Sequence, residues 1–247
     1  MHIKMLKIEN YMHVVMKNAK KRHNSLGVLS SVSSSDMVRC GDMTNAIVEL
    51  NMSEFLDDDL CEFSLQEVDG ERAVLRPLGE ADVLPLFELI EGSRKFLSEH
   101  LPWLAEECRT LEDVSAKMDA WDLQAQMANG ACWGIFEKVA NADLKIAGCI
   151  MLGWVQWKNR SATVSYWLGQ DFCGRGLATE ALLLVAGEAF AMSLNRLELT
   201  ASVNNPKSVA VARRAGFTEE GICREYERIH DHFEDHIRFS LLARDFC

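Results

Sequence analysis

An apolar strand that runs straight into a glycine turn and a helix constrains this chain more than any other feature. The strand is predicted to end at residues 166–168, the turn to cover 173–176 and the helix to begin at Leu177. Gly174 and Gly176 suit a backbone that needs positive φ. A helix opening at such a turn directs its first unpaired N–H groups, and the positive end of its dipole, outward. The segment therefore predicts a cradle for an anion such as a diphosphate.

Composition and charge exclude several classes of protein. The chain has 247 residues, 48% of them hydrophobic, which is enough to bury a full core. Its 26 Lys and Arg against 37 Asp and Glu give a net charge of -11, which argues against nucleic-acid binding and favours a cationic substrate. Eight cysteines without a Cys-x-x-Cys pair predict reduced core thiols and a cytoplasmic location. No run approaches the ~20 apolar residues of a membrane span, so no membrane association is expected.

Regular patterns begin only near residue 71. The upstream sequence has a basic start, a Ser-rich patch and the acidic run at 54–59, without sustained periodicity. It predicts a poorly structured N-terminal extension over 1–70, ahead of a folded domain over 71–247. The Lys- and Met-rich first residues also fit an organelle-targeting segment, and Met37 or Met52 would fit a later translation start.

From residue 72 onward the patterns predict an α/β (α+β) fold. Amphipathic spacing, caps and turn residues locate the helices, and β-rich segments separated by short polar turns indicate antiparallel hairpins. The expected elements are strand 73–78, helices 80–91 and 110–130, strands 133–136, 146–157 and 162–168, helix 177–192, strand 196–203, helix 205–216 and strand 236–241. This order predicts a mixed, mostly antiparallel central sheet with helices on both faces.

Two other phosphate-binding designs compete for the glycine loop. A dinucleotide fold would use Gly174-x-Gly176 together with an acidic residue about twenty positions later, where Glu198 stands. However, Thr179 occupies the third small-residue position, and hairpins rather than βαβ units precede the loop. A Walker-type loop is excluded because no Gly-Lys-Ser/Thr follows.

Several motifs in a fixed order resemble the GCN5-related N-acetyltransferase (GNAT) family over roughly residues 72–245. The family's coenzyme A loop, Gln/Arg-x-x-Gly-x-Gly/Ala, matches residues 173–178 at every position except the first, Cys173. The Asn205-Pro206-Lys207-Ser208 segment followed by residues 214–217 is similar to the same family. Within the family, residues 166–168, 176–182, 204–208 and 216–221 resemble the branch that acetylates ribosomal-protein N-termini, the RimJ/RimL type. The Trp-containing turn at 100–104 lies where that branch has its acceptor pocket.

The resemblance implies acetyl-CoA as cosubstrate and a definite set of site residues. Those expected to hold the coenzyme are Tyr166, Trp167, Leu168, Cys173, Gly174, Arg175, Gly176, Leu177, Ala178, Thr179, Asn205 and Ser208. Glu227 matches the base that takes the amine proton, and Ser208 the acid that protonates the thiolate, with Tyr226 as a weaker substitute acid. The residues alone leave other roles open. Glu227 could be a solvated charge beside Arg224 and Arg228, and Ser208 could be an ordinary helix residue.

A histidine-rich segment at 230–236 contains good metal ligands. A tetrahedral site normally draws a second ligand group from elsewhere, and the sequence offers none, so we expect no metal and instead a polar segment near the acceptor. The predicted function is transfer of an acetyl group from acetyl-CoA to a primary amine, foremost the N-terminal amino group of a ribosomal or other protein. A small-molecule amine acetyltransferase and a catalytically inactive coenzyme A-binding module remain the alternatives. Oligomeric state stays open, a homodimer included.

Overall fold

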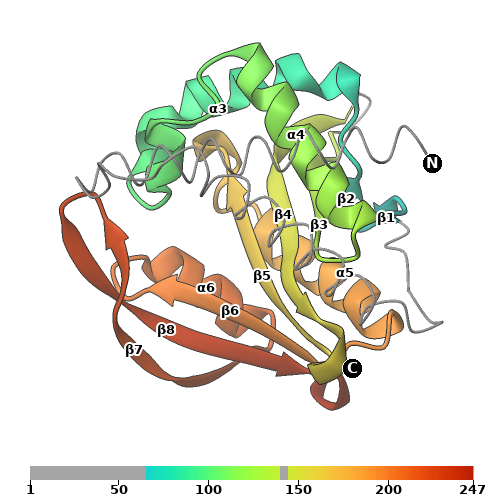
Figure 1. Cartoon of the computed structure of the whole chain (residues 1–247), viewed down its shortest axis with the longest axis vertical. Helices are drawn as coiled ribbons and strands as arrows, with labels where there is room; N and C mark the ends of the chain where they lie inside the picture. Colours follow the sequence, from blue (N-terminus) through green and yellow to red (C-terminus); the bar gives the residue numbers. More distant parts are fainter. Residues whose placement is uncertain (1–64, 140–143, 247) are drawn as a thin grey trace, which may run out of the picture. The chain divides into compact units, whose positions relative to one another are not determined.

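One mixed sheet organises the part of the chain that the computed structural model describes, residues 65–139 and 144–246 (Figure 1). Its strand order is β1-β2-β3-β4-β5-β6-β8-β7, and every neighbouring pair is antiparallel except β5 and β6. The strands are β1 (Val68–Asp69), β2 (Ala73–Arg76), β3 (Ala131–Glu137), β4 (Lys145–Gln156), β5 (Ser161–Leu168), β6 (Arg196–Ser202), β7 (Thr218–Ile229) and β8 (His232–Leu242). The predicted mostly antiparallel sheet is confirmed.

Helices cover both faces of this sheet, as predicted (Figure 1). The described helices are α3 (Val83–Ser98), α4 (Leu111–Gln126), α5 (Leu177–Ala191) and α6 (Pro206–Arg214). Strand β4 supplies side chains to both cores, because successive side chains of a strand point to opposite faces and a bulge between Ile146 and Gly148 shifts this alternation by one residue. Ala147 and Ile150 pack in the core that contains α5 and α6, whereas Ile146 and Cys149 pack in the core beneath α3 and α4.

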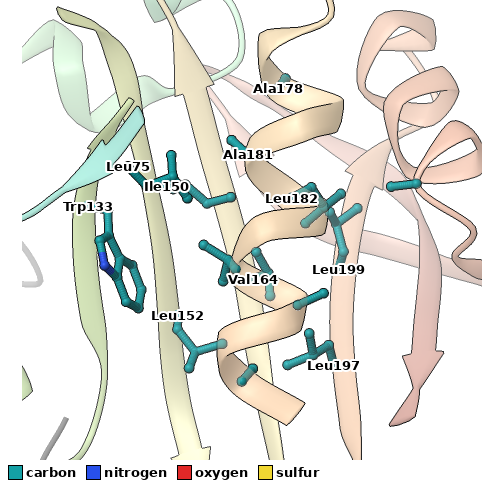
Figure 2. Packing of buried hydrophobic residues seen from close by; sticks show 14 of the residues in the cluster. Leu75, Trp133, Ile150, Leu152, Val164, Ala178, Ala181, Leu182, Leu197 and Leu199 are labelled. Atoms are coloured by element: carbon teal, nitrogen blue, oxygen red, sulfur yellow. The ribbon is translucent and has the colours of Figure 1, made fainter. Parts of the chain in front are cut away.

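Helix α5 is the central support of its face of the sheet. Its buried side chains recur at helical spacing, including Ala178, Ala181 and Leu182, and Figure 2 shows them against strand residues such as Val164 and Leu199. The first residue of α5, Leu177, is also buried, so the N-terminus of the helix is fixed against the sheet. This packing gives the preceding loop a rigid base.

The single parallel pair of the sheet opens at its carboxyl end. Strands β5 and β6 are paired only from Ser161↔Arg196 to Thr163↔Glu198. Beyond this short ladder, β5 continues to Leu168 along β4, and β6 continues to Ser202 along β8. An unpaired strand edge therefore faces the space between them, at the end where the chain leads into α5 and α6.

The structure differs from the sequence prediction in several elements, among them two helices. Helix α3 continues past Gly92 to Ser98, because Ser93 and Leu97 extend its buried face. Helix α4 begins at the predicted cap Thr110, whose side chain accepts a hydrogen bond from the N–H of Asp113, but it ends at Gln126 instead of Gly130.

Strand β7 is a further difference, because the sequence pattern did not predict it. It is an edge strand with only Ile229 buried, and two irregularities interrupt its register with β8. Neither a buried face nor a strict period of two is present to reveal it. Strand β8 also begins at His232, four residues before the predicted strand. The extension predicted over 1–70 lies mostly outside the described residues, and the domain boundary stays a prediction.

Candidate active site

The glycine loop has the backbone geometry that its sequence predicts. Gly174 and Gly176 adopt φ of +79° and +83°, the left-handed region that favours glycine. Gly176 is the N-cap of α5, and within the described part of the chain no side chain caps that end of the helix. The first N–H groups of α5 therefore stay available to a ligand, together with the positive end of the helix dipole.

A cavity of about 280 Å³ lies in front of this helix end. It is lined by Leu168 from the end of β5, by the loop and first turn of α5, and by Val211 and Arg214 from α6. The predicted residues Gly174, Gly176, Leu177, Ala178 and Thr179 are all part of this lining. Its volume is near the lower end of typical ligand clefts, so it suits one part of a long ligand such as coenzyme A.

Val211 and Arg214 were missed in the sequence analysis. They lie three residues apart on α6, so they share one face of the helix. The helix that the sequence predicts after Asn205 could have indicated them. Arg214 contributes a cation beside the uncapped helix end, which suits an anionic ligand.

Backbone groups of β5 face the opening between β5 and β6. A Cβ placed on Gly148 would lie 2.0 Å from the carbonyl oxygen of Trp167, so that carbonyl points toward β4. The N–H of Gly169 likewise donates to Ala147 of β4, at 2.8 Å. Alternation along the strand then turns the backbone groups of Tyr166 and Leu168 to the other edge, toward the opening.

Trp167 takes a different position from its two neighbours. Its side chain is buried in the core beneath α3 and α4, on the far face of the sheet. Both its backbone and its side chain are thus directed away from the opening. The coenzyme contacts that the resemblance implies for this strand end can therefore come from Tyr166 and Leu168, but not from Trp167.

Tyr166 and Ser208 meet at the opening. The hydroxyl of Tyr166 on β5 and the Oγ of Ser208 on α6 lie 2.9 Å apart, within hydrogen-bond distance. Asn205 caps α6, and its Oδ1 accepts the N–H of Ser208 at 3.1 Å, which fixes the first turn of the helix. Burial raises the pKa of Tyr166, with partial compensation from the Ser208 hydrogen bond, so the phenol stays protonated at neutral pH.

Cys173 and Arg175 are engaged within the protein. The Sγ of Cys173 lies 3.6 Å from the carbonyl oxygen of Gly169, and burial raises the pKa of its thiol, so it is not a thiolate nucleophile at neutral pH. Arg175 donates to both carboxylate oxygens of Glu137 on β3, each at 2.9 Å. The structure therefore gives Arg175 an ion-pair partner at the rim of the loop.

Glu227 lies on the edge strand β7, whereas the glycine loop follows β5 in the middle of the sheet. Its Oε2 lies 3.5 Å from the Nε2 of His236 on β8. His236 is paired in register with Ser202, the last residue of β6, and α6 begins four residues after Ser202. Glu227 and Ser208 therefore lie on elements that meet at the carboxyl end of β6.

The histidine-rich segment carries hydrogen bonds to carboxylates. His232 Nε2 lies 3.0 Å from Glu234 Oε1, and this contact is the largest cause of the raised pKa of His232. The pKa of Glu234 is lowered, first by the hydrogen bond from the Ser202 hydroxyl and also by His232. Within residues 65–139 and 144–246, no three His, Cys, Asp or Glu side chains gather as a metal site.

No helix in this part of the chain is long and apolar enough to cross a membrane.

Comparison with known proteins identifies the family. The sequence model of the acetyltransferase (GNAT) domain family matches residues 72–218 of this chain. The protein YdaF of Bacillus subtilis (strain 168) is 31% identical over 178 residues, which cover 71% of this chain and 94% of YdaF. The ribosomal-protein-serine acetyltransferase of Escherichia coli (strain K12) is 27% identical over 71% of this chain and 93% of its own length.

A solved structure of RimL, an α-N-protein acetyltransferase of ribosomal L7/L12 in complex with coenzyme A, has a similar fold. Its TM-score is 0.66 at 22% identity, over 72% of this chain and 98% of RimL. The antiparallel strands before the loop exclude the dinucleotide alternative. With the family model matching more than half of its 247 residues, the chain belongs to the GNAT family of acetyltransferases, as its motifs predicted.

Proposed function

We propose that this protein transfers the acetyl group of acetyl-CoA to the N-terminal amino group of a ribosomal protein. The observation that carries the proposal is the uncapped N-terminus of α5, which opens onto a cavity at the parting of β5 and β6. The acceptor class is suggested by the Escherichia coli relative, which is named for acetylation of a ribosomal-protein serine. The described cysteines are free, which suits the reducing cytoplasm.

The residues present fit coenzyme A. Two glycines with positive φ give a diphosphate access to the first N–H groups of α5, and Arg214 adds a positive charge at the same cavity. The outward backbone groups of Tyr166 and Leu168 suit the amide-bearing arm of the coenzyme along the edge of β5. Bound there, acetyl-CoA supplies an activated acetyl group as a thioester.

Glu227 is the proposed base. An α-amine has a reference pKa of about 7.7–8.0, so a carboxylate at the acceptor can take its proton as the nitrogen attacks the carbonyl. The side chain of Glu227 is 45% exposed, which leaves it accessible to an incoming amine. The acidic balance of the chain, -11 overall, attracts a cationic N-terminus.

Ser208 is the proposed acid. When the carbon–sulfur bond breaks, the departing thiolate needs a proton, and the Ser208 hydroxyl can give one while Tyr166 hydrogen-bonds to its oxygen. The raised pKa of Tyr166 keeps its proton available for this hydrogen bond. Tyr226, the weaker substitute, lies on β7 against the ring of His236, 4.9 Å between centroids.

The proposal is tested by measuring thiol release from acetyl-CoA with three sets of acceptors. These are peptides that copy ribosomal-protein N-termini, the same peptides blocked at the N-terminus, and small amines. We expect turnover with the free peptides only. Turnover confined to small amines would point to a small-molecule acetyltransferase. Coenzyme binding without turnover on any acceptor would point to an inactive binding module, and either result contradicts the proposal.

The role of Glu227 has its own test. Glu227→Gln keeps the shape of the side chain but removes the base, so kcat should fall by roughly 10²-fold with little change in acetyl-CoA binding. Glu219→Gln is the matched control, because Glu219 is a carboxylate of the same strand that is paired with Arg213 at 2.7 Å. Equal activity of Glu227→Gln and wild type would remove Glu227 from this role.

A further inference from the structure

His236 has a buried imidazole beside the carboxylate of Glu227. Its side chain is 7% exposed, and neither ring nitrogen has a partner among the described residues. Buried polar atoms are nearly always paired, so an orphaned ring beside a candidate active site requires an explanation. The carboxylate of Glu227, 3.5 Å from Nε2, is slightly beyond hydrogen-bond distance.

The other groups around this ring do not supply the missing partner. Glu234, on the same strand, is occupied by the hydroxyl of Ser202 and by His232. Tyr226 contacts the ring of His236 with the two planes tilted by 35° and so offers π-surface. Burial lowers the pKa of His236, opposed by the charges of Glu227 and Glu234, so the ring is neutral at neutral pH.

A bulge in β7 fixes the backbone next to Glu227. Cys223 is paired with His236 and Glu227 with Glu234, so three residues of β7 face one residue of β8. Glu225, inside the bulge, has a φ of +49° and donates its N–H to Asp235 Oδ1 at 2.8 Å. The irregular strand thus brings the Glu227 carboxylate close to the His236 ring, as bulges near active sites often redirect a side chain.

We propose that His236 is a positioning residue for Glu227, holding one carboxylate oxygen through Nε2–H so that the other faces the acceptor amine. This inference rests on the proposed function, in which Glu227 is the base. A neutral imidazole donates one hydrogen bond without adding a charge, so it orients the carboxylate and leaves it able to accept a proton. Small displacements of a base are costly, because proton transfer requires close approach of the two atoms.

A double-mutant cycle in turnover tests the coupling. His236→Phe keeps a ring of similar size against Tyr226 but removes both nitrogens, and it should lower kcat about tenfold with KM for acetyl-CoA unchanged. His236→Gln, which can still donate near the position of Nε2, should recover part of that loss. In a Glu227→Gln background, His236→Phe should cost nothing further, because its effect acts through the base.

His232→Phe is the matched control, since it removes an imidazole of the same strand whose contacts are to Asp231 and Glu234. Whatever it costs should be the same in the wild-type background and in the Glu227→Gln background, that is, additive. A loss from His236→Phe that is equally large in both backgrounds would overturn the proposal, as would full activity of His236→Phe.

Histidine ¹⁵N NMR supplies a readout that does not depend on turnover. The His236 signals, assigned by their loss in His236→Gln, should move and titrate at a lower pH in Glu227→Gln, because a negative neighbour has been removed. Unchanged signals would overturn the contact on which the proposal stands. A wild type that acetylates no amine would overturn the proposed function as well, whereas an active wild type with additive losses would overturn this inference alone.

Discussion

The proposed coenzyme side and the proposed acceptor side of this site are held together by different forces. Helix α5 and its loop rest on apolar packing, with seven of fifteen helix residues buried. Strand β7, which carries Glu227, has a single buried residue among twelve and is attached through its ladder with β8 and a few polar contacts. One site can therefore combine a coenzyme cradle fixed by core packing with an acceptor region whose shape depends on side-chain interactions.

The packing of α5 should give the largest effect. Leu182→Ala empties a fully buried position, so the free energy of unfolding should fall by about 2–5 kcal/mol. Ile222→Ala on β7, where the side chain is 60% exposed, should change it by no more than about 0.5 kcal/mol. Urea unfolding of the two variants measures both, and equal losses would show that the two regions are not supported differently.

The glycine loop should give the next effect. Gly176→Ala places a Cβ at φ +83°, where an L-residue costs about 1–2 kcal/mol, while the nearest atom, Arg72 Nη1, is at an ordinary 3.6 Å. Acetyl-CoA affinity by calorimetry should weaken about tenfold if the loop relaxes. Gly216→Ala, with a similar φ of +81°, is the control and should lower stability but keep the affinity. Unchanged affinity in Gly176→Ala would separate the loop from coenzyme binding.

The Tyr166 hydroxyl should matter less. Tyr166→Phe keeps the ring and removes the 2.9 Å contact with Ser208, a hydrogen bond that contributes about 1 kcal/mol. We expect kcat to fall about fivefold with little change in acetyl-CoA affinity. A variant as fast as wild type would show that Ser208 acts without this partner.

Acid stability should show the smallest effect. Arg196 and the Ser240 hydroxyl hold the pKa of Glu220 at about 2, below its usual 4.5, and so tie β7 to β6 and β8. A lowered folded-state pKa stabilises the fold above the unfolded value and loses that contribution as the pH falls from 4.5 toward 2. Glu220→Gln should therefore lower the free energy of unfolding at pH 7, by less than about 1 kcal/mol because the pair is partly exposed. The free energy of unfolding of the variant should also fall less steeply as the pH is lowered from 4.5 toward 2. If wild type and Glu220→Gln showed the same dependence of unfolding stability on pH, this contact would not contribute to stability.

Sequence reasoning worked where local chemistry decides the structure. The glycine turn, the start of α5 at Leu177 and the Asn205 cap follow from backbone preferences of a few residues, and the structure reproduces them. Helix α3 continues through Gly92 because burial of Leu97 outweighs a glycine penalty of about 1 kcal/mol, which no local pattern reveals.

The acceptor side depends on contacts between strands. β7 is a bulged, exposed edge strand, so its residues do not alternate. The approach of His236 to Glu227 follows from that bulge, and the sequence offers no signal for it. The resemblance could single out Glu227, but not the ring beside it.

Amide hydrogen exchange with and without coenzyme A tests the central claim most directly. If the coenzyme binds at the uncapped helix end and along the edge of β5, exchange should slow over residues 174–179 and at Tyr166 and Leu168. Strand β7 should exchange at the same rate in both states. Protection confined to the β7–β8 hairpin, or no protection in the loop at saturating coenzyme, would contradict the placement of the coenzyme and with it the division of the site into two regions.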